Sequence, residues 1–304
     1  MKIQELLKEF KDEYVILIDM SWVMYKSHYA FQRLTNQHGE QTGSFYGLGK
    51  AIQTLKESYP EALILLVDDG APIERKELDN NYKANREHTV HFTDKKYRVD
   101  CMIQNVPNVY RIYNPVIEAD DLMFSISRIK DYQNQFIIYT SDKDLYQALD
   151  ESTWLASEIS QGQLLLKDST NDQYLKFFQD LQPFQVPFFR AVLGDPSDNL
   201  KIIRPRFPSK VAYYFAKNYV SRLADGSTGI TKPSSKPKDL TQKQYEALLE
   251  IYSSQEFINN LRLMKLKFNP TIPIVEKDKQ SKEVLDVLHN LELHQFLNWV
   301  STQY

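Results

Sequence analysis

The sequence predicts an α/β fold in which a mainly parallel central sheet is flanked by helices and followed by a C-terminal helical region. Short apolar runs alternate with amphipathic stretches along the first half of the chain. These runs are continuous rather than alternating in polarity, as in strands that helices cover on both faces. After about residue 182 the pattern becomes mostly helical, with turns rich in proline. We therefore expect two regions, residues 1–182 around the sheet and residues 183–304 as the helical part.

The elements follow from hydrophobic periodicity and from turn residues. We expect an amphipathic helix over 2–11, a strand at 15–18, a helix from about Ser44 as its N-cap, a strand at 63–67, a helix over 94–104, a strand at 109–113, a helix over 119–130, a strand at 136–139, a short helix over 143–149 and an edge hairpin of 154–157 with 163–166. Residues 225–238 combine glycine, serine, proline and lysine, which predicts a mobile loop or linker. Several helices are expected from residue 240 onward.

Composition places the chain among globular proteins. It has 304 residues, of which 42% are hydrophobic and 25% charged. The first thirteen residues are rich in charge and form no apolar signal segment, and no later apolar run reaches membrane-spanning length. We expect a cytoplasmic protein without a membrane partner, in the host cytoplasm if the gene is of phage origin. A single cysteine, Cys101, excludes an intramolecular disulfide and a cysteine zinc site.

Carboxylates collect just past the predicted strands. They are Asp19, then Asp68 and Asp69, then Asp142 and Asp144, with two further clusters at Glu118, Asp120 and Asp121 and at Asp195 and Asp198. Loops at the carboxyl ends of parallel strands form the ligand crevice of open α/β folds. So many carboxylates would repel one another unless cations lay among them. Because oxygen ligands without nearby histidine or cysteine suit Mg²⁺ or Mn²⁺, we predict a divalent metal site.

The chain contains two clusters of basic residues, although its net charge is −3. The first runs from Arg75 and Lys76 to Lys83 and Arg86, and the second consists of Lys201, Arg204, Arg206 and Lys210. Phosphate binding follows local patches rather than total charge, so both are candidate nucleic-acid contacts.

Six motifs occur in a characteristic order. They are "LIDMSW", "LVDDG", "RKEL" followed by "YKANR", "EADD", "TSDKDL" and "GDPSDNL". In this order and approximate spacing they resemble the flap endonuclease and 5′→3′ exonuclease family of PIN-like nucleases, over about residues 14–215. The chain is similar to the compact phage-type members of that family, which include the phage RNase H that removes primers. The resemblance implies a PIN-like sheet domain and a helical duplex-binding region.

The resemblance also implies a centre with two Mg²⁺ ions, for which Mn²⁺ can substitute. The first ion would be held by Asp19, Asp69, Glu118 and Asp120, and the second by Asp121, Asp142, Asp144 and Asp198, partly through water, with Asp195 close by. Asp69, rather than Asp68, stands at the family's ligand position. Lys83 and Arg86, three apart on an expected helix, would clamp the scissile phosphate as catalytic cations, with Arg75 and Lys76 assisting.

Two further expectations concern the path of the nucleic acid. Residues from about 87 to 105 would begin an arch-like loop for a single-stranded 5′ end, because cationic and aromatic side chains are mixed there. Residues 195–220 would form a degenerate helix-turn-helix with Ser209 as an N-cap. Family members have a glycine-rich turn that binds a monovalent cation, whereas no glycine occurs from Asp195 to Asn218. This argues against that cation site, and Lys201, Arg204, Arg206 and Lys210 would hold duplex phosphates by charge instead.

The sequence therefore predicts a metal-dependent, structure-specific 5′ nuclease that acts on duplex DNA with a 5′ flap or an RNA primer in phage-type replication or repair. We expect a monomer that works beside single-strand-binding or replication proteins. Two alternatives stay open, a PIN-type single-strand ribonuclease and a non-catalytic DNA-binding protein on the same fold. The sequence leaves open the choice between exonuclease and endonuclease action and between RNA and DNA in the 5′ strand.

Overall fold

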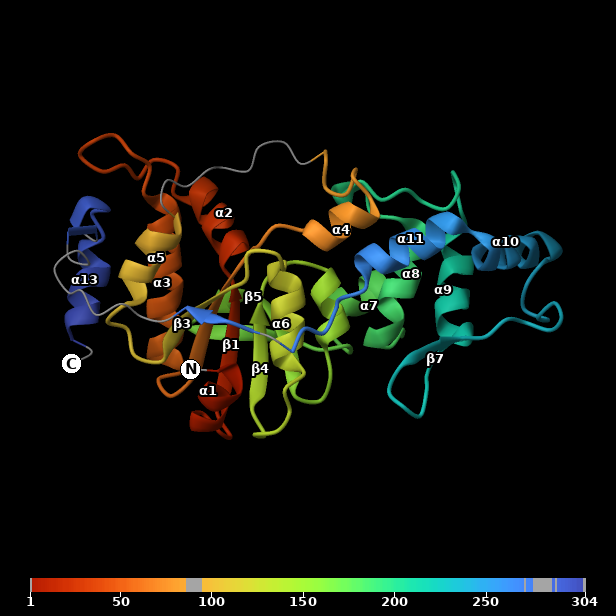
Figure 1. Cartoon of the computed structure of the whole chain (residues 1–304), viewed down its shortest axis with the longest axis horizontal. Coiled ribbons are helices and arrows are strands. Elements are labelled where there is room, and N and C mark those ends of the chain that lie inside the picture. The colour runs from red at the N-terminus through yellow and green to blue at the C-terminus, as the bar shows by residue number, and fades with distance from the viewer. Residues whose placement is uncertain (1, 86–94, 271, 276–285, 288, 303–304) are drawn as a thin grey trace.

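A mainly parallel sheet forms the centre of the protein, as predicted (Figure 1). The computed structural model describes residues 2–85, 95–270, 272–275, 286–287 and 289–302. Within these residues seven strands form one sheet in the order β6-β5-β4-β1-β2-β3-β9. The strands are β1 (Tyr14–Asp19), β2 (Leu63–Asp68), β3 (Val109–Tyr113), β4 (Gln135–Tyr139), β5 (Thr153–Ser160), β6 (Gln163–Lys167) and β9 (Ile274–Val275). Strands β5, β4, β1, β2 and β3 pair in parallel, while the expected hairpin partner β6 and the opposite edge strand β9 are antiparallel.

Alternate residues of each central strand enter two separate cores. In β1, Val15 and Leu17 pack with one cluster of buried side chains, whereas Ile16 and Ile18 pack with the other. All four are fully buried. The continuous apolar run thus reflects helices on both faces of the sheet.

The helices that cover the two faces come from different parts of the chain. One face carries α1 (Ile3–Glu9), α6 (Ala119–Ser127), the 3₁₀ helix η1 (Asp144–Ala148) and α7 (Asp172–Phe178). The other carries α2 (Met20–Ala30), α3 (Gly43–Ser58), α5 (Lys95–Ile103) and α13 (His294–Ser301). The expected elements of this domain are present, but α2 and α7 were not predicted. In α3 the N-cap position belongs to Thr42 rather than Ser44.

A helical region with its own core lies beside the sheet domain (Figure 1). It contains η2 (Pro183–Gln185), α8 (Val186–Leu193), η3 (Pro196–Asp198), α9 (Ser209–Tyr219), α10 (Gln242–Ser253) and α11 (Gln255–Met264), and α4 (Ile73–Leu78) contacts α11. Buried Phe188, Val211 and Phe215 join α8 to α9. Ser209 is the first residue of α9, and Pro208 holds the N-cap position that was predicted for Ser209.

Two predictions about the second half need correction. The segment 225–238, predicted as a loop or linker, contains β8 (Thr228–Ile230), which pairs with β7 (Val220–Arg222). The division after residue 182 also fails for the C-terminal tail, because β9 pairs with β3 and α13 packs against α3. Phe296 and Val300 of α13 are buried in the core of the sheet domain. An amphipathic pattern predicts the helix but does not reveal which distant surface it will cover.

None of the helices in the described ranges has both the length and the apolar character required to span a membrane.

Candidate active site

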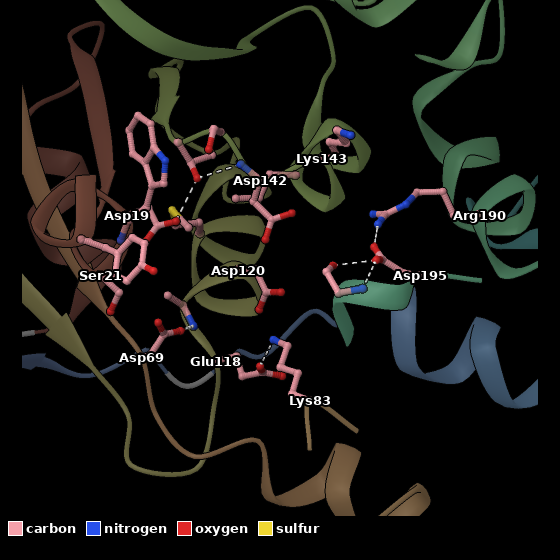
Figure 2. A pocket seen from close by; sticks show the side chains of 18 of the residues that line it. Asp19, Ser21, Asp69, Lys83, Glu118, Asp120, Asp142, Lys143, Arg190 and Asp195 are labelled. Carbon is pink, nitrogen blue, oxygen red and sulfur yellow. Dashed lines mark hydrogen bonds and ion pairs between the residues drawn. The ribbon is translucent and has the colours of Figure 1, made fainter. Parts of the chain in front are cut away.

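A crevice of about 1270 Å³ opens where the carboxyl ends of β1, β2 and β4 meet the start of α6 and the end of α8. Six of the predicted acidic residues line it, and these are Asp19, Asp69, Glu118, Asp120, Asp142 and Asp195. Figure 2 shows Asp19 and Asp69 on one side, Asp195 on the opposite side, and Asp120 and Asp142 between them. The fold thus gathers in one place residues that are up to 176 positions apart in the chain.

Asp19 is fixed by donors that carry no charge. Its carboxylate accepts hydrogen bonds from the backbone N–H of Trp22 at 3.0 Å and from the Thr140 hydroxyl at 2.8 Å. The same hydroxyl oxygen of Thr140 accepts a hydrogen bond from the Asp142 N–H at 3.1 Å, so it joins the loops after β1 and β4. Burial, followed by the nearby charge of Asp69, raises the pKa of Asp19 to about 7. The raised pKa thus comes first from the loss of solvent around the carboxylate and then from the neighbouring negative charge.

Asp69 depends on the glycine that follows it. The Asp69 carboxylate accepts a hydrogen bond from the Ala119 N–H at 3.0 Å, at the start of α6. Gly70 donates its N–H to the Ile117 carbonyl at 2.9 Å. A Cβ atom at residue 70 would lie 2.0 Å from the Asn114 carbonyl oxygen, so the two loops approach this closely only with glycine.

Asp68 lies behind the crevice rather than in it. Its side chain is buried, and it accepts a hydrogen bond from Lys95 Nζ at 2.9 Å. Lys95 also lies 3.1 Å from the Ser21 hydroxyl, and Arg111 lies 3.6 Å from the other oxygen of Asp68. The geometry matches the prediction that Asp69 faces the site and that Asp68 is its neighbour.

Lys83 enters the crevice from a turn. Its Nζ lies 2.5 Å from Glu118 Oε1, and its backbone N–H donates to the Asp198 carbonyl at 3.0 Å. Burial lowers the pKa of Lys83, but Tyr82 and the surrounding carboxylates raise it by more, so the ammonium group stays charged. Lys83 has a positive φ of 56° and therefore does not stand on the helix that we expected. Arg86, its predicted partner, lies outside the described residues.

Asp121 and Arg75, predicted as a metal ligand and a phosphate contact, pair with each other behind the crevice. The Arg75 guanidinium forms two bonds with the Asp121 carboxylate, at 2.7 and 2.9 Å, and also pairs with Glu118. Arg75 further donates to the Leu263 carbonyl, and Asp121 accepts from the Lys267 N–H. Both side chains are buried, and neither lines the crevice. Asp121 and Arg75 thus bind each other, and together they join α4, α6 and the segment after α11.

A second cation, which the sequence analysis missed, lies at the far side of the crevice. Arg190 of α8 pairs with both Asp144 and Asp195. Asp144 and Asp198 are buried and do not line the crevice, although both adjoin residues that do. The signal in the sequence was a single arginine within the apolar helix "VPFFRAVL", five residues before Asp195. Thr140 was likewise overlooked, although it belongs to the quoted motif "TSDKDL".

The turn between α8 and α9 reverses direction without a glycine after Asp195. Asn199 and Arg206 take positive φ values of 61° and 58° there. Asn199 and Arg206 thus adopt the left-handed backbone conformation for which glycine is the usual residue. The turn therefore forms without the glycines that family members have.

The remaining predicted phosphate contacts are mostly exposed. Lys76, Lys201, Arg206 and Lys210 have exposed side chains, whereas Arg204 is half-buried and donates to Glu250 at 2.6 Å. Of the arch-like loop expected over about 87–105, residues 87–94 lie outside the described part. Residues 95–103 are helix α5, in which Val99 and Met102 are buried.

The lining of the crevice suits a hard divalent cation. Among the described residues it contains six carboxylates and neither histidine nor cysteine. Among the described residues, however, no three acidic, histidine or cysteine side chains converge on one point closely enough to hold an ion as they stand. Lys83 and Arg190 hold several of these carboxylates instead. Mg²⁺ or Mn²⁺ therefore fits the chemistry of the donors, and binding would draw their side chains together.

This mainly parallel α/β sheet, with its acidic crevice and adjoining helical region, has the architecture of the PIN-like 5′ nucleases. The family model described as 5′-3′ exonuclease, N-terminal resolvase-like domain matches residues 14–175. The chain therefore belongs to the 5′-3′ exonuclease family.

Relatives of known name support this membership. The 5′-3′ exonuclease of Buchnera aphidicola subsp. Acyrthosiphon pisum is 24% identical over 275 residues, which cover 90% of this chain and 93% of the relative. A thermostable DNA polymerase I of Thermus thermophilus is 30% identical over 188 residues, or 61% of this chain, and this match spans only 22% of the polymerase.

Solved structures share the fold. The T5 D15 protein, co-crystallized with metal ions, has a TM-score of 0.57 at 16% identity, with 95% of this chain and all of that chain covered. Flap endonuclease-1 from Methanococcus jannaschii has a TM-score of 0.52 at 12% identity, with 100% of this chain and 96% of that chain covered.

Proposed function

We propose that the protein hydrolyses phosphodiester bonds at or near the 5′ ends of duplex nucleic acid, in a reaction that requires divalent metal ions. One observation carries the proposal. Six carboxylates from five separate segments line a single crevice, and Lys83 extends into the same space. Such a cluster suits the binding of cations and, through them, of a phosphate group.

The carboxylates fall into two groups. Asp19, Asp69, Glu118 and Asp120 would hold the first ion, while Asp142, Asp144, Asp195 and Asp198 surround the place of the second. Asp121, the remaining acidic residue of the expected set, binds Arg75 and would have to exchange this partner to hold an ion. When bound, two Mg²⁺ ions activate water and stabilise the leaving 3′ oxygen of an in-line displacement. We propose Mg²⁺ as the natural ion and Mn²⁺ as its substitute, and no monovalent cation site in the α8–α9 turn.

Lys83 is proposed as the phosphate-binding catalytic cation. Its ammonium group already pairs with a carboxylate of the crevice, Glu118, and it stays protonated among acidic neighbours. A phosphate oxygen arriving in the crevice would compete with Glu118 for that ammonium group. Lys83 would then offset charge that grows on the phosphate in the transition state. Arg86 is proposed as its helper from sequence alone.

The helical region is proposed to hold the duplex. Lys201, Arg206 and Lys210 are exposed around the α8–α9 turn, and Arg204 adds charge that Glu250 partly offsets. Lys76 is exposed on α4 and is a further candidate contact. Contacts of this kind bind phosphates without reading base sequence, as a structure-specific nuclease requires.

The named relatives support a task in replication or repair. They are a 5′-3′ exonuclease and DNA polymerases I in sequence, and T5 and flap nucleases in fold. We propose removal of 5′ flaps or RNA primers in phage-type replication, by a cytoplasmic monomer that works beside single-strand-binding or other replication proteins.

The test is a cleavage-product map with Mg²⁺ present. End-labelled 5′-flap, nicked and RNA-primed duplexes would be compared with the isolated single strand. The proposal expects products released from the 5′ strand of the duplexes, and none when a chelator replaces Mg²⁺. Preference for the isolated strand would instead favour a single-strand ribonuclease, and binding without any cleavage would favour a non-catalytic DNA-binding protein.

A further inference from the structure

Arg190 occupies the place where carboxylates for a second ion gather. Its guanidinium pairs with Asp144 and with Asp195, two of the four residues assigned to that ion. The exposed fractions of the three side chains are only 12% for Arg190, 12% for Asp144 and 17% for Asp195. Figure 2 shows the Arg190–Asp195 pair across the crevice from Asp19 and Asp69.

The pair is held in place by its surroundings. Arg190 stands in the last turn of α8, whose Phe188, Ala191 and Val192 are buried in the helical core. Gly194 then turns the chain with a φ of 71°, and this brings Asp195 back beside Arg190. A Cβ atom at residue 194 would lie 2.5 Å from the Lys201 carbonyl carbon, so the turn admits only glycine without a shift.

Asp195 has further anchors besides Arg190. It accepts hydrogen bonds from the Ser197 N–H at 2.9 Å and from the Ser197 hydroxyl at 2.6 Å. Both bonds end on Oδ1, so Ser197 orients the carboxylate while Oδ2 pairs with Arg190. Asp144 donates its backbone N–H to Asp142 at 2.8 Å, which ties the Arg190 pair to the centre of the crevice.

On the opposite side of the crevice, Glu118 pairs with Lys83 and Arg75, but Asp19 and Asp69 form no ion pair with a cation of the described residues. Within the described part of the chain, Asp19 accepts from Trp22 and Thr140, and Asp69 accepts from Ala119. These neutral donors leave the negative charge in place for a metal ion. A guanidinium, by contrast, keeps its positive charge at every working pH, and that of Arg190 already pairs with one oxygen of Asp144 and one of Asp195.

We propose that Arg190 is a built-in cation of the second metal position, so that the protein free of nucleic acid binds one divalent ion tightly and a second only weakly. The inference rests on the proposed function, since it assumes the divalent metal centre. A phosphate group of the substrate can take over the guanidinium in two-pronged hydrogen bonds. Asp144 and Asp195 are then released to the second ion, which makes Arg190 a positioning residue that couples substrate to metal loading.

The experiment counts Mn²⁺ bound to the full chain by electron paramagnetic resonance of the free ion, without nucleic acid. Wild type is expected to bind one ion tightly. Arg190→Gln removes the charge and is expected to tighten the second ion by about tenfold, a change equivalent to about 1.4 kcal/mol. Arg190→Lys keeps the charge but can hold only one carboxylate at a time, so a smaller gain of about threefold is expected. If the Arg190→Gln variant does not fold, the Arg190→Lys variant still tests the proposal.

Lys143→Gln is the matched control. Lys143 also lines the crevice, but its Nζ lies over the Phe177 ring, 4.1 Å from the centroid. It should leave both Mn²⁺ affinities unchanged. Two tight ions in wild type, or equal gains from the Arg190 and Lys143 variants, would overturn the proposal. Absence of Mn²⁺ binding in every variant would overturn the metal-dependent function and this inference together, a pattern distinct from the other two.

Discussion

The carboxylates on the two flanks of the crevice are held by different kinds of hydrogen-bond donor. The first flank, Asp19 and Asp69, lies at the carboxyl ends of β1 and β2 and is held by neutral hydroxyl and N–H donors. The second flank, Asp144 and Asp195, is held by the guanidinium of Arg190, which comes from a helix of the other core. Neutral donors orient a carboxylate and leave its charge for an ion, whereas an arginine both orients it and takes its charge.

The largest expected effect comes from Asp120, which lies between the flanks. Asp120→Asn should reduce the single-turnover cleavage rate of a labelled 5′-flap duplex by about a thousandfold, because one of the carboxylates proposed to hold the first ion is lost. Affinity for the duplex, measured by fluorescence anisotropy in Ca²⁺, should stay within about twofold. Asp172→Asn, an exposed helix residue, is the control. Cleavage by Asp120→Asn at the wild-type rate would remove the metal centre from this crevice.

Lys83 should matter for turnover more than for binding. Lys83→Ala is expected to lower the cleavage rate by about a hundredfold while it weakens duplex affinity only a few-fold, because its charge acts on the transition state. The comparison uses Lys76→Ala, an exposed lysine on nearby α4. If Lys83→Ala instead weakened affinity and left the rate of the saturated enzyme intact, Lys83 would be a simple phosphate contact.

The second flank depends on the backbone of Gly194. Gly194→Ala should lower the free energy of unfolding by about 2 to 3 kcal/mol, because it combines a left-handed conformation with a steric clash. Gly226→Ala is a matched control, since Gly226 has a φ of 81° but no atom within 4 Å of an added Cβ. That variant should cost only about 1 kcal/mol. Equal losses in urea titrations of the two variants would show that the close packing at residue 194 adds nothing.

The smallest expected effect distinguishes two arginines of the α8–α9 turn. Arg206 is exposed, whereas Arg204 pairs with Glu250. Arg206→Ala should flatten the dependence of log affinity on log salt concentration by about one unit, as the loss of one phosphate contact predicts. Arg204→Ala should change this slope by less. A slope that neither substitution alters would exclude this turn from the duplex interface.

The sequence predicted the central strands and the acidic residues that follow them, because both are visible in short local patterns. Continuous apolar runs marked the central strands, and the acidic residues after them had to meet at one edge of a parallel sheet. Asp69 was separated from Asp68 only by the family motif, and the structure supplies the reason, since Asp68 is occupied by Lys95. Helix α2 was missed because its exposed Tyr25 and Tyr29 blur the amphipathic pattern.

The sequence did not reveal partners that lie far apart in the chain. Arg75 looked like a phosphate ligand and Asp121 like a metal ligand, yet each satisfies the other across 46 positions. Arg190 was overlooked because a lone arginine in an apolar helix carries no motif. The return of β9 and α13 to the sheet domain likewise depends on complementary surfaces that no local pattern encodes.

The most direct test of the two-flank account is anomalous diffraction from crystals of the nucleic-acid-free protein soaked in Mn²⁺. The account predicts one strong manganese peak within ligand distance of Asp19, Asp69 or Asp120, with the Arg190 pairs to Asp144 and Asp195 intact. A strong peak at Asp144 and Asp195, with none at the first flank, would contradict it.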